Sequence, residues 1–431
     1  MVHPNATASA APGRGNPTFM APSLAAAREH VHDNALDRTL AADPLVTADS
    51  PTGDSTLAGR TTVLPRVVSE DSGALRLETH ERSRYSSIRR LGGGAMGDVD
   101  LSTDHDIGRR VALKRLTKSV SSPATVARFV DEVRTMGSLD HPHITPIYDV
   151  GRDEDGRLFF TMKYVEGESL DQLIDRLAAG DEEAHAQYPL ARRLDIFVGI
   201  LHALDYAHAR GILHRDITPA NVMLGEHGEV RLVDWGIARR GAARDERSAG
   251  LSSSRPDMTQ DGALLGTPLY MAPEQARGDR AAVDARSDLY SAFLVLFELL
   301  TLRSYVTDHG TVYEILKEVL EGQGPWKDPE TWGHASQPPV PVEIRHFMRR
   351  GLRRDPEARF ADASAALHEL ERLRSGEIDA HCTLSLLKAK QNHMLRFAEA
   401  RPRLFMSMMA TMGIGLLGTL VLAGFGVAAL V

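Results

Sequence analysis

Two short segments of the sequence carry acidic and amide side chains at a spacing that suits phosphate chemistry. Residues 214–221 have the pattern H-R-D-x-x-x-x-N, and Asp234 follows Asn221 by thirteen residues. In this pattern Asp216 can accept the proton of a hydroxyl group, and Asn221 and Asp234 can hold the magnesium ion that bridges nucleotide phosphates. The order and spacing predict phosphoryl transfer, with a purely structural network of carboxylates as the alternative.

A glycine-rich stretch upstream is a candidate for binding the phosphates. Gly92, Gly94 and Gly97 form a G-x-G-x-x-G pattern, which is weak by itself because dinucleotide-binding folds use it too. A dinucleotide site needs a helix that starts at the glycines, whereas Asp98–Leu101 has the alternation of a strand. We therefore expect the glycines in a hairpin, where the missing Cβ lets backbone amides approach phosphate oxygens. A flexible turn without function is the alternative.

Lys114 ends an apolar, strand-like run and can reach the α- and β-phosphates of a nucleotide. Because a lysine has a long flexible stem, it needs a partner to hold it in place. The candidate partners are Asp131 and Glu132, which lie on a predicted helix, where one step turns the side chain by about 100°. Glu132 shares the apolar side of that helix, so we expect it to pair with Lys114. A solvated salt-bridging face is the alternative.

The elements that must carry these residues follow from hydrophobic periodicity. Strand-like runs and one helical run come first, in the order 87–91, 98–101, 111–114, the helical 126–139, then 144–150 and 158–165. Beyond Leu170 helical spacing dominates, as at 194–209 and 289–300. A small strand-rich part therefore precedes a larger helix-rich part, and residues 164–167 join them.

Composition limits the remaining interpretations. The chain has 431 residues and a formal net charge of −8, which gives no electrostatic reason to expect a nucleic-acid partner. Cys382 is the only cysteine, so an intramolecular disulfide is excluded. Residues 1–84 lack sustained apolar periodicity and are rich in turn-forming residues, and we expect them to be a disordered tail with order beginning near Tyr85.

The run Leu404–Val431 contains no charged residue. Roughly 20 apolar residues cross a bilayer core, so we expect a transmembrane helix here, with a soluble core helix as the alternative. Arg396, Arg401 and Arg403 precede the run. Because basic flanks stay on the cytoplasmic side, we expect a single-pass membrane protein with its main domain in the cytoplasm. Small residues within the run favour helix pairing, and hence a homodimer: Gly413, Gly415 and Gly418.

The segment opened by Asp234 closes at Ala272-Pro273-Glu274, after Thr267. With these residues the chain resembles bacterial serine/threonine protein kinases of the eukaryotic-like type. The resemblance implies an α+β fold with two lobes, a small antiparallel sheet with one helix and a large helical lobe. The expected domains are the tail 1–84, the kinase domain 85–373 with lobes 85–165 and 166–373, a juxtamembrane linker 374–403 and the transmembrane helix 404–431.

The resemblance also implies ATP, magnesium or manganese, and protein substrates that accept the γ-phosphate on serine or threonine. The catalytic residues it implies are Asp216, Lys114, Glu132 and Asn221, with Asn221 and Asp234 as metal ligands. The residues it implies for ATP binding are Leu91, Gly92, Gly93, Gly94, Ala95, Met96, Gly97, Val99, Ala112, Lys114, Met162, Tyr164, Val165 and Leu224. In this family Asp288 would brace the catalytic loop and Arg359 would pair with Glu274.

Two positions depart from the usual residues of the family. Thr218 stands where serine/threonine kinases usually carry a lysine on the γ-phosphate, although Thr267 is the serine/threonine-type feature. Trp235 replaces the usual phenylalanine and is large enough to pack in its place. A membrane-anchored pseudokinase that transfers nothing is the alternative function, and the presence of the lysine, both loop residues and the metal aspartate argues against it.

Arg215 precedes Asp216, and kinases with this arginine are commonly switched by phosphorylation of the activation segment. Hydroxyl residues of a long polar stretch are the candidate phosphosites: Ser248, Ser252, Ser253, Ser254 and Thr259. A phosphate there would carry about −1.5 to −2 charges and can pair with Arg215. A disordered insertion without a switch is the alternative.

Overall fold

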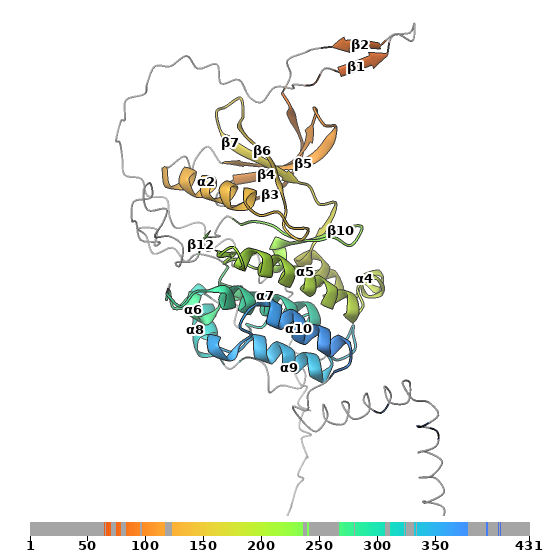
Figure 1. The fold of residues 1–431 in the computed structure, drawn as a ribbon, viewed down its shortest axis with the longest axis vertical. Coiled ribbons are helices and arrows are strands. Elements are labelled where there is room, and N and C mark those ends of the chain that lie inside the picture. Colours follow the sequence, from red (N-terminus) through yellow and green to blue (C-terminus); the bar gives the residue numbers. More distant parts are fainter. Residues whose placement is uncertain are drawn as a thin grey trace, which may run out of the picture.

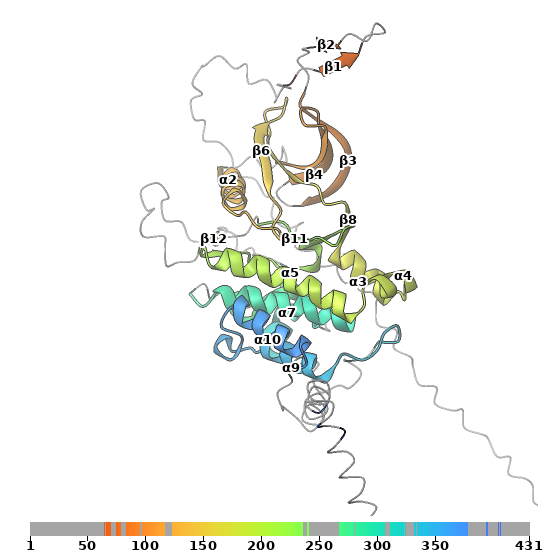
Figure 2. The same ribbon diagram turned by 45° about the vertical axis from the view of Figure 1, so that its right-hand side comes forward.

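The computed structural model describes residues 83–377 except 95–96, 117–122, 236–238, 241–266, 280, 307–310, 323, 325–331 and 333. It also describes two strands before residue 83 and the single residues 64, 394, 404 and 406. Figures 1 and 2 show a strand-rich lobe above a helical lobe, with the chain passing from the first to the second. The two-lobed arrangement expected from the sequence is confirmed.

Five antiparallel strands form the sheet of the smaller lobe, in the spatial order β3-β4-β5-β7-β6. They are β3 (Tyr85–Gly94), β4 (Gly97–Asp104), β5 (Arg109–Leu116), β6 (Ile147–Arg152) and β7 (Leu158–Lys163). In the central strand β5, the four consecutive residues from Val111 to Lys114 are all buried. Because successive side chains of a strand point to opposite faces, both faces of the sheet are covered at this point.

One helix, α2 (Pro123–Gly137), packs on the sheet face that carries Lys114. Phe160 of β7 pairs directly with Lys114 across the sheet. The ring of Phe129 on α2 packs on the ring of Phe160, with centroids 5.4 Å apart. Phe129, Glu132 and Met136 are buried on one side of α2, three or four residues apart. This helical spacing directs Glu132 toward the sheet.

The larger lobe is built from helices. They are α3 (Leu170–Ala178), α4 (Glu182–Gln187), α5 (Leu190–His208), α6 (Pro273–Ala276), α7 (Ala285–Thr301), α8 (Val312–Glu321), α9 (Val342–Gly351) and α10 (Ala363–Arg374). α7 is the centre of this lobe, because every residue from Ser287 to Thr301 is buried and α5 and α9 pack against it. Polar side chains on such a helix need hydrogen-bond partners, since burial without them costs free energy.

Short strands frame the loops at the junction of the lobes. β8 (Gly167–Ser169), β10 (Val222–Gly225) and β11 (Val230–Leu232) form one sheet, and β9 (Ile212–Leu213) pairs with β12 (Arg239–Arg240). Asn221 comes just before β10, and Asp234 follows β11 closely. The N–H of Val233 donates to the carbonyl of Asn221 at 2.9 Å. The two predicted metal ligands, Asn221 and Asp234, therefore lie at the same end of the β10–β11 hairpin.

A short hairpin in the predicted tail was not expected. β1 (Arg66–Ser69) pairs with β2 (Leu75–Glu78) within residues 1–84. Strands of four residues carry too little alternation to stand out in a sequence. Before β1, the N–H of Leu64 donates to Asp106 Oδ1 at 3.1 Å, so this part of the chain contacts the sheet lobe. The expectation that order begins near Tyr85 is wrong for this hairpin.

The predicted membrane helix at 404–431 and the linker at 374–403 lie almost entirely outside the described residues. Within the part of the chain that the structure describes, no helix is both long and apolar enough to cross a bilayer. The membrane anchor, its orientation and the homodimer therefore stay predictions.

We predict that Gly351→Ala destabilises the helical lobe. Gly351 ends α9, and a Cβ built on it would overlap the ring of Phe293 on α7. Overpacking of this kind costs about 1–3 kcal/mol, which should appear as a lower free energy of unfolding in urea titrations. Gly137→Ala is the control, because a Cβ at this end of α2 meets nothing within 4 Å. Equal losses in the two variants would contradict the packing argument.

Candidate active site

Lys114 and Glu132 form an ion pair between β5 and α2. The Nζ–Oε1 distance is 2.6 Å, and both side chains are buried. Of the two candidate carboxylates, α2 turns Glu132 inward and leaves Asp131 exposed. Since the sheet strand and the helix are separate elements, this pair fixes the position of α2 together with that of the lysine.

Asp234 is the second partner of Lys114. Its Oδ1 lies 3.2 Å from Nζ, and its side chain is 49% exposed, whereas Glu132 is 1% exposed. Asp234 has φ of 58°, in the left-handed region that few residues other than glycine adopt. The next residue, Trp235, is fully buried and packs on His214 with ring centroids 4.6 Å apart. The buried indole thus holds the turn that presents Asp234 where a ligand can reach it.

Two carboxylates keep Lys114 charged in spite of its burial. Burial by itself lowers the pKa of a lysine, but the charges of Asp234 and Glu132 and their hydrogen bonds outweigh it, so the pKa of Lys114 is raised. The ammonium group is therefore retained as a compact positive charge beside Asp234. A fixed cation in this place suits the phosphate oxygens of a nucleotide.

A buried carboxylate on α7 fixes the loop that carries Asp216. Asp288 accepts the backbone N–H of His214 at Oδ2 and that of Arg215 at Oδ1, both at 2.8 Å. His208, the last residue of α5, places its Nε2 2.8 Å from the same Oδ2. The loop holds Arg215 at φ of 69°, a conformation that costs about 1–3 kcal/mol outside glycine. The carboxylate of Asp288 stabilises this strained turn by binding two consecutive amides.

The Asp216 carboxylate contacts the segment that ends at Glu274. Its Oδ1 accepts the N–H of Thr267 at 3.0 Å, and the side-chain amide of Asn221 donates to its backbone carbonyl at 2.9 Å. Burial raises the pKa of Asp216, and the hydrogen bond from Thr267 acts in the opposite direction. A carboxylate held in this way, with its pKa moved toward neutrality, is suited to accept a hydroxyl proton.

Asn221 and Asp234 supply oxygen atoms of the kind that magnesium and manganese bind. Because the amide nitrogen of Asn221 donates to the Asp216 carbonyl, its Oδ1 is the atom that can face a cation. Asp234 adds a half-exposed carboxylate. Mg²⁺ accepts so sparse a protein donor set, because it keeps water and phosphate oxygens as its other ligands. The residues present therefore fit the metal.

Several residues predicted to contact ATP lie on one face of the sheet. Directly paired residues of neighbouring strands share a face, and the register pairs Val99 with Lys114 and Ala112 with Met162. Ala112 is buried, whereas Val99 and Met162 are partly exposed. This face is the one that also carries the ion pair with α2. The residues predicted to bind the base and the lysine predicted to bind the phosphates therefore lie together.

The predicted glycines lie in the β3–β4 hairpin, as expected. Leu91, Gly92, Gly93 and Gly94 end β3, Gly97 begins β4, and Ala95 and Met96 between them lie outside the described residues. A Cβ on Gly97 would overlap the backbone of Arg115, so this position requires glycine. Tyr164 and Val165 follow β7, and Leu224 is buried in β10 of the other lobe.

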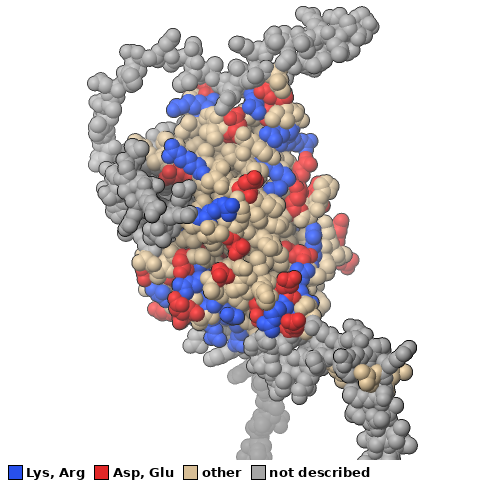
Figure 3. All heavy atoms as spheres, in the orientation of Figure 1, with Lys and Arg blue, Asp and Glu red and all other residues tan. Residues whose placement is uncertain are grey.

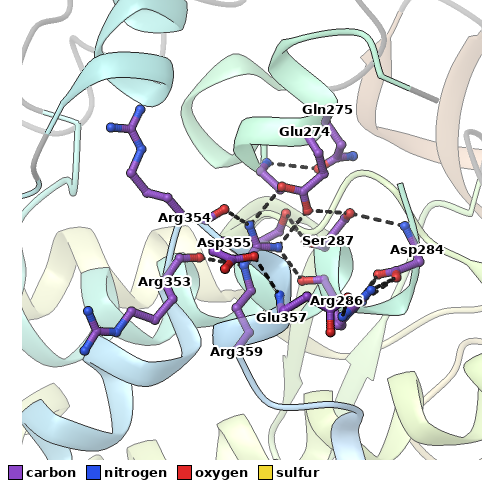
Figure 4. A network of polar contacts seen from close by, with 12 residues as sticks. Glu274, Gln275, Asp284, Arg286, Ser287, Arg353, Arg354, Asp355, Glu357 and Arg359 are labelled. Carbon is purple, nitrogen blue, oxygen red and sulfur yellow. Dashed lines mark hydrogen bonds and ion pairs between the residues drawn. The ribbon is translucent and has the colours of Figure 1, made fainter. Parts of the chain in front are cut away.

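Glu274 and Arg359 anchor the end of the predicted activation segment (Figure 4). Arg359 donates to both Glu274 oxygens, at 2.6 and 2.8 Å, and both side chains are buried. Ser287 of α7 donates to the same carboxylate at 2.7 Å. The other guanidinium donors bind the carbonyls of three residues: Arg286, Arg353 and Arg354. The pair is therefore fully hydrogen-bonded, as a buried ion pair requires.

The proteins that this chain resembles are protein kinases. A sequence model described as the protein kinase domain matches residues 85–370. The chain belongs to the protein kinase family. A probable serine/threonine-protein kinase of Streptomyces coelicolor is 36% identical over 303 residues, which cover 68% of this chain and 40% of the relative.

Two further relatives of the kinase domain carry similar names. The serine/threonine-protein kinase PknD of Protochlamydia amoebophila is 31% identical over 318 residues, which cover 72% of this chain and 32% of the relative. The serine/threonine-protein kinase PknB of Mycobacterium tuberculosis is 31% identical over 314 residues, which cover 69% of this chain and 44% of the relative. The chain thus spans less than half the length of these relatives.

Two residues that hold the catalytic loop of the kinase domain were not predicted from the sequence. His208 contacts Asp288, which binds the loop amides, and Gln275 donates directly to the carbonyl of Arg215 at 3.2 Å. Gln275 stands at the third position of α6, where a helix cap could have been predicted. Nothing in the sequence marks it as a partner of a loop about sixty residues away. The candidate phosphosites lie outside the described residues: Ser248, Ser252, Ser253, Ser254 and Thr259.

We predict that Arg359→Met costs about 3–5 kcal/mol of the free energy of unfolding, because it leaves the buried Glu274 carboxylate without its cation. Urea titration measures the loss. Arg374→Ala is the control, since its pair with Asp195 is exposed on both sides and is worth at most about 1 kcal/mol. Similar losses in the two variants would show that the buried pair has no special importance.

The ion pair of Glu274 and Arg359 also makes the stability of the protein depend on pH. Burial alone raises the pKa of Glu274, but the hydrogen bond and charge of Arg359, with Ser287, hold that pKa below its ordinary value. A carboxylate with a lowered folded-state pKa stabilises fully above its ordinary pKa, and this contribution is lost as pH falls through the folded-state pKa. The stability gap between wild type and Arg359→Met should therefore narrow in acid below the ordinary carboxyl range. A gap that widened there would contradict this sign.

Proposed function

We propose that this chain is an ATP-dependent protein kinase that phosphorylates serine and threonine residues of proteins. The observation that carries the proposal is the charged group formed by Lys114, Glu132 and Asp234, with Asp216 nearby in contact with Thr267. A retained ammonium, a half-exposed carboxylate and a positioned base are what phosphoryl transfer to a hydroxyl needs. The serine/threonine kinases among the relatives support the choice of acceptor.

Each residue has a defined role in the proposed reaction. Lys114 donates to the α- and β-phosphates, while backbone amides of the β3–β4 hairpin cover the phosphates. The acceptor oxygen forms a bond to the γ-phosphorus, the bond to the bridging oxygen breaks, and ADP leaves with that electron pair. Asp216 takes the proton of the acceptor hydroxyl. A magnesium or manganese ion held by Asn221 and Asp234 would neutralise charge on the phosphate oxygens.

Thr218 modifies this proposal without removing it. It is buried in the catalytic loop and carries no charge, so the site has no cation at the position where the family usually has a lysine. Among the site residues that the structure describes, Lys114 is the cation placed to bind the phosphates, and the metal would add its charge. We expect slower transfer than in kinases that carry the lysine, because one stabilising charge of the transition state is absent.

Phosphorylation of the activation segment is the proposed switch, including autophosphorylation at Ser248, Ser252, Ser253, Ser254 or Thr259. Arg215, whose backbone is bound by Asp288, is the proposed partner of the phosphate. A doubly charged phosphate beside an arginine forms charge-assisted hydrogen bonds that can order a segment.

We also propose that 404–431 anchors the kinase domain at the cytoplasmic side of a membrane and that its glycines favour a homodimer. The face of the kinase domain drawn in Figure 3 bears Lys and Arg interspersed with Asp and Glu. The described charges on this face therefore do not select a polyanionic partner. Protein substrates remain the proposed partners.

The alternative, a pseudokinase scaffold, has the same fold and differs only in chemistry. We predict that Asp216→Asn lowers phosphate incorporation from labelled ATP by about 10²–10⁴-fold, since it removes the base and keeps the shape. Asp234→Ala should abolish it and weaken metal-dependent nucleotide binding. Asp131→Asn on the exposed side of α2 is the control and should leave the rate unchanged.

The measurement is incorporation into the full chain and into a general protein substrate with magnesium, followed by identification of the phosphorylated residue types. Phosphoserine and phosphothreonine in wild type, lost in Asp216→Asn, support the proposal. Incorporation in Asp216→Asn at the wild-type rate would contradict the role of Asp216 as the base. No incorporation in wild type would favour the scaffold.

A further inference from the structure

Gln275 links two parts of the site that lie far apart in the sequence. Its Nε2 donates to the carbonyl of Arg215 at 3.2 Å, and its Oε1 accepts the N–H of Ala272 at 3.0 Å. A carbonyl can only accept and a backbone N–H can only donate, so the two partners fix the orientation of the amide. The side chain thus joins the catalytic loop to the segment that runs from Thr267 to α6.

The bond from Gln275 acts on the peptide unit that carries Asp216. The Arg215 carbonyl belongs to the peptide bond between Arg215 and Asp216, and the N–H of that bond donates to His214 Nδ1 at 3.3 Å. Asp288 holds the preceding N–H groups from α7. Rotation of this peptide plane would move the Asp216 side chain. Such a rotation would relieve the backbone strain of Arg215, which has a left-handed conformation. Gln275 opposes that rotation from the side of the activation segment.

We propose that Gln275 is a positioning residue that couples the placement of the segment from Thr267 to α6 to the orientation of the Asp216 base. Asp216 already contacts this segment through Thr267, and Gln275 supplies a second connection through the backbone. When the segment lies against α7, both connections form and the base is aligned. This inference rests on the proposed kinase function, because it names a role in the same reaction.

The test uses a substitution that separates helix capping from positioning. Gln275→Glu keeps the oxygen that accepts the Ala272 N–H, but places a carboxylate oxygen against the Arg215 carbonyl. Gln172→Glu is the matched control, because Gln172 caps α3 in the same way by accepting the N–H of Ser169 at 3.0 Å. Gln275→Leu removes both hydrogen bonds of the side chain and reports the combined effect of losing the helix cap and the contact with Arg215.

Steady-state kinetics of the full chain give the first readout. Gln275→Glu should lower kcat for a protein substrate by about tenfold to a hundredfold, with KM for ATP and the midpoint of thermal unfolding unchanged. Gln172→Glu should leave kcat unchanged. A wild-type kcat in Gln275→Glu, or an equal fall in both glutamate variants, would overturn the inference.

Amide hydrogen exchange gives a readout that does not require activity. In Gln275→Glu, exchange should accelerate together in peptides that contain Asp216 and in those that contain residues 267–272, while Gln172→Glu shows neither change. Acceleration confined to 267–272 would reduce Gln275 to a helix cap and overturn the coupling. An inactive wild-type chain that still shows the coupled exchange would count against the proposed function and not against this connection.

Discussion

The charged group formed by Lys114, Glu132 and Asp234 is the interaction on which the rest of the site depends. It joins β5, α2 and the turn after β11, which are separate elements. A buried ion pair contributes little to net stability, because desolvation offsets its Coulomb energy. Its value here is positional, since a shift of α2 away from the sheet would take Glu132 with it and leave the lysine free to move.

Polar residues of α7 have the corresponding role in the helical lobe. Asp288 binds the amides of the catalytic loop, and Ser287 joins the pair of Glu274 and Arg359. These side chains lie on a helix whose residues from Ser287 to Thr301 are all buried, so each polar side chain needs a hydrogen-bond partner. The left-handed turn at Arg215 is held in this way from several sides, which is how local strain persists at a functional site.

Sequence reasoning reached those parts of the site whose geometry is local. The phase of a helix separates Glu132 from Asp131, and the loop 214–221 carries its own spacing, so both could be predicted from the chain alone. Periodicity likewise predicted a strand-rich part followed by a helix-rich part, and the order of the elements in the first of them. The pairing of Gln275 with Arg215 could not be predicted, because contacts between distant segments depend on tertiary packing and leave no periodic pattern.

The hairpin β1–β2 was missed for a related reason, since four-residue strands fall below the length at which alternation is informative. The predictions on 241–266 and on 404–431 concern segments that the structure does not describe, except for the single residues 404 and 406, and they stay predictions. The structure therefore adds mainly the contacts between elements that are distant in the sequence. These are the contacts of the sheet with α2, of the loop 214–221 with the segment from Thr267 to α6, and of α7 with that loop.

A double-mutant cycle on Lys114 and Glu132 tests the central claim most directly. The rate of phosphoryl transfer is measured for Lys114→Met, Glu132→Gln and the double variant. If Glu132 acts only by holding Lys114, the double variant should be no slower than Lys114→Met, because the glutamate has nothing left to position. Losses that multiply in the double variant would show that the two residues act independently, and would contradict the account.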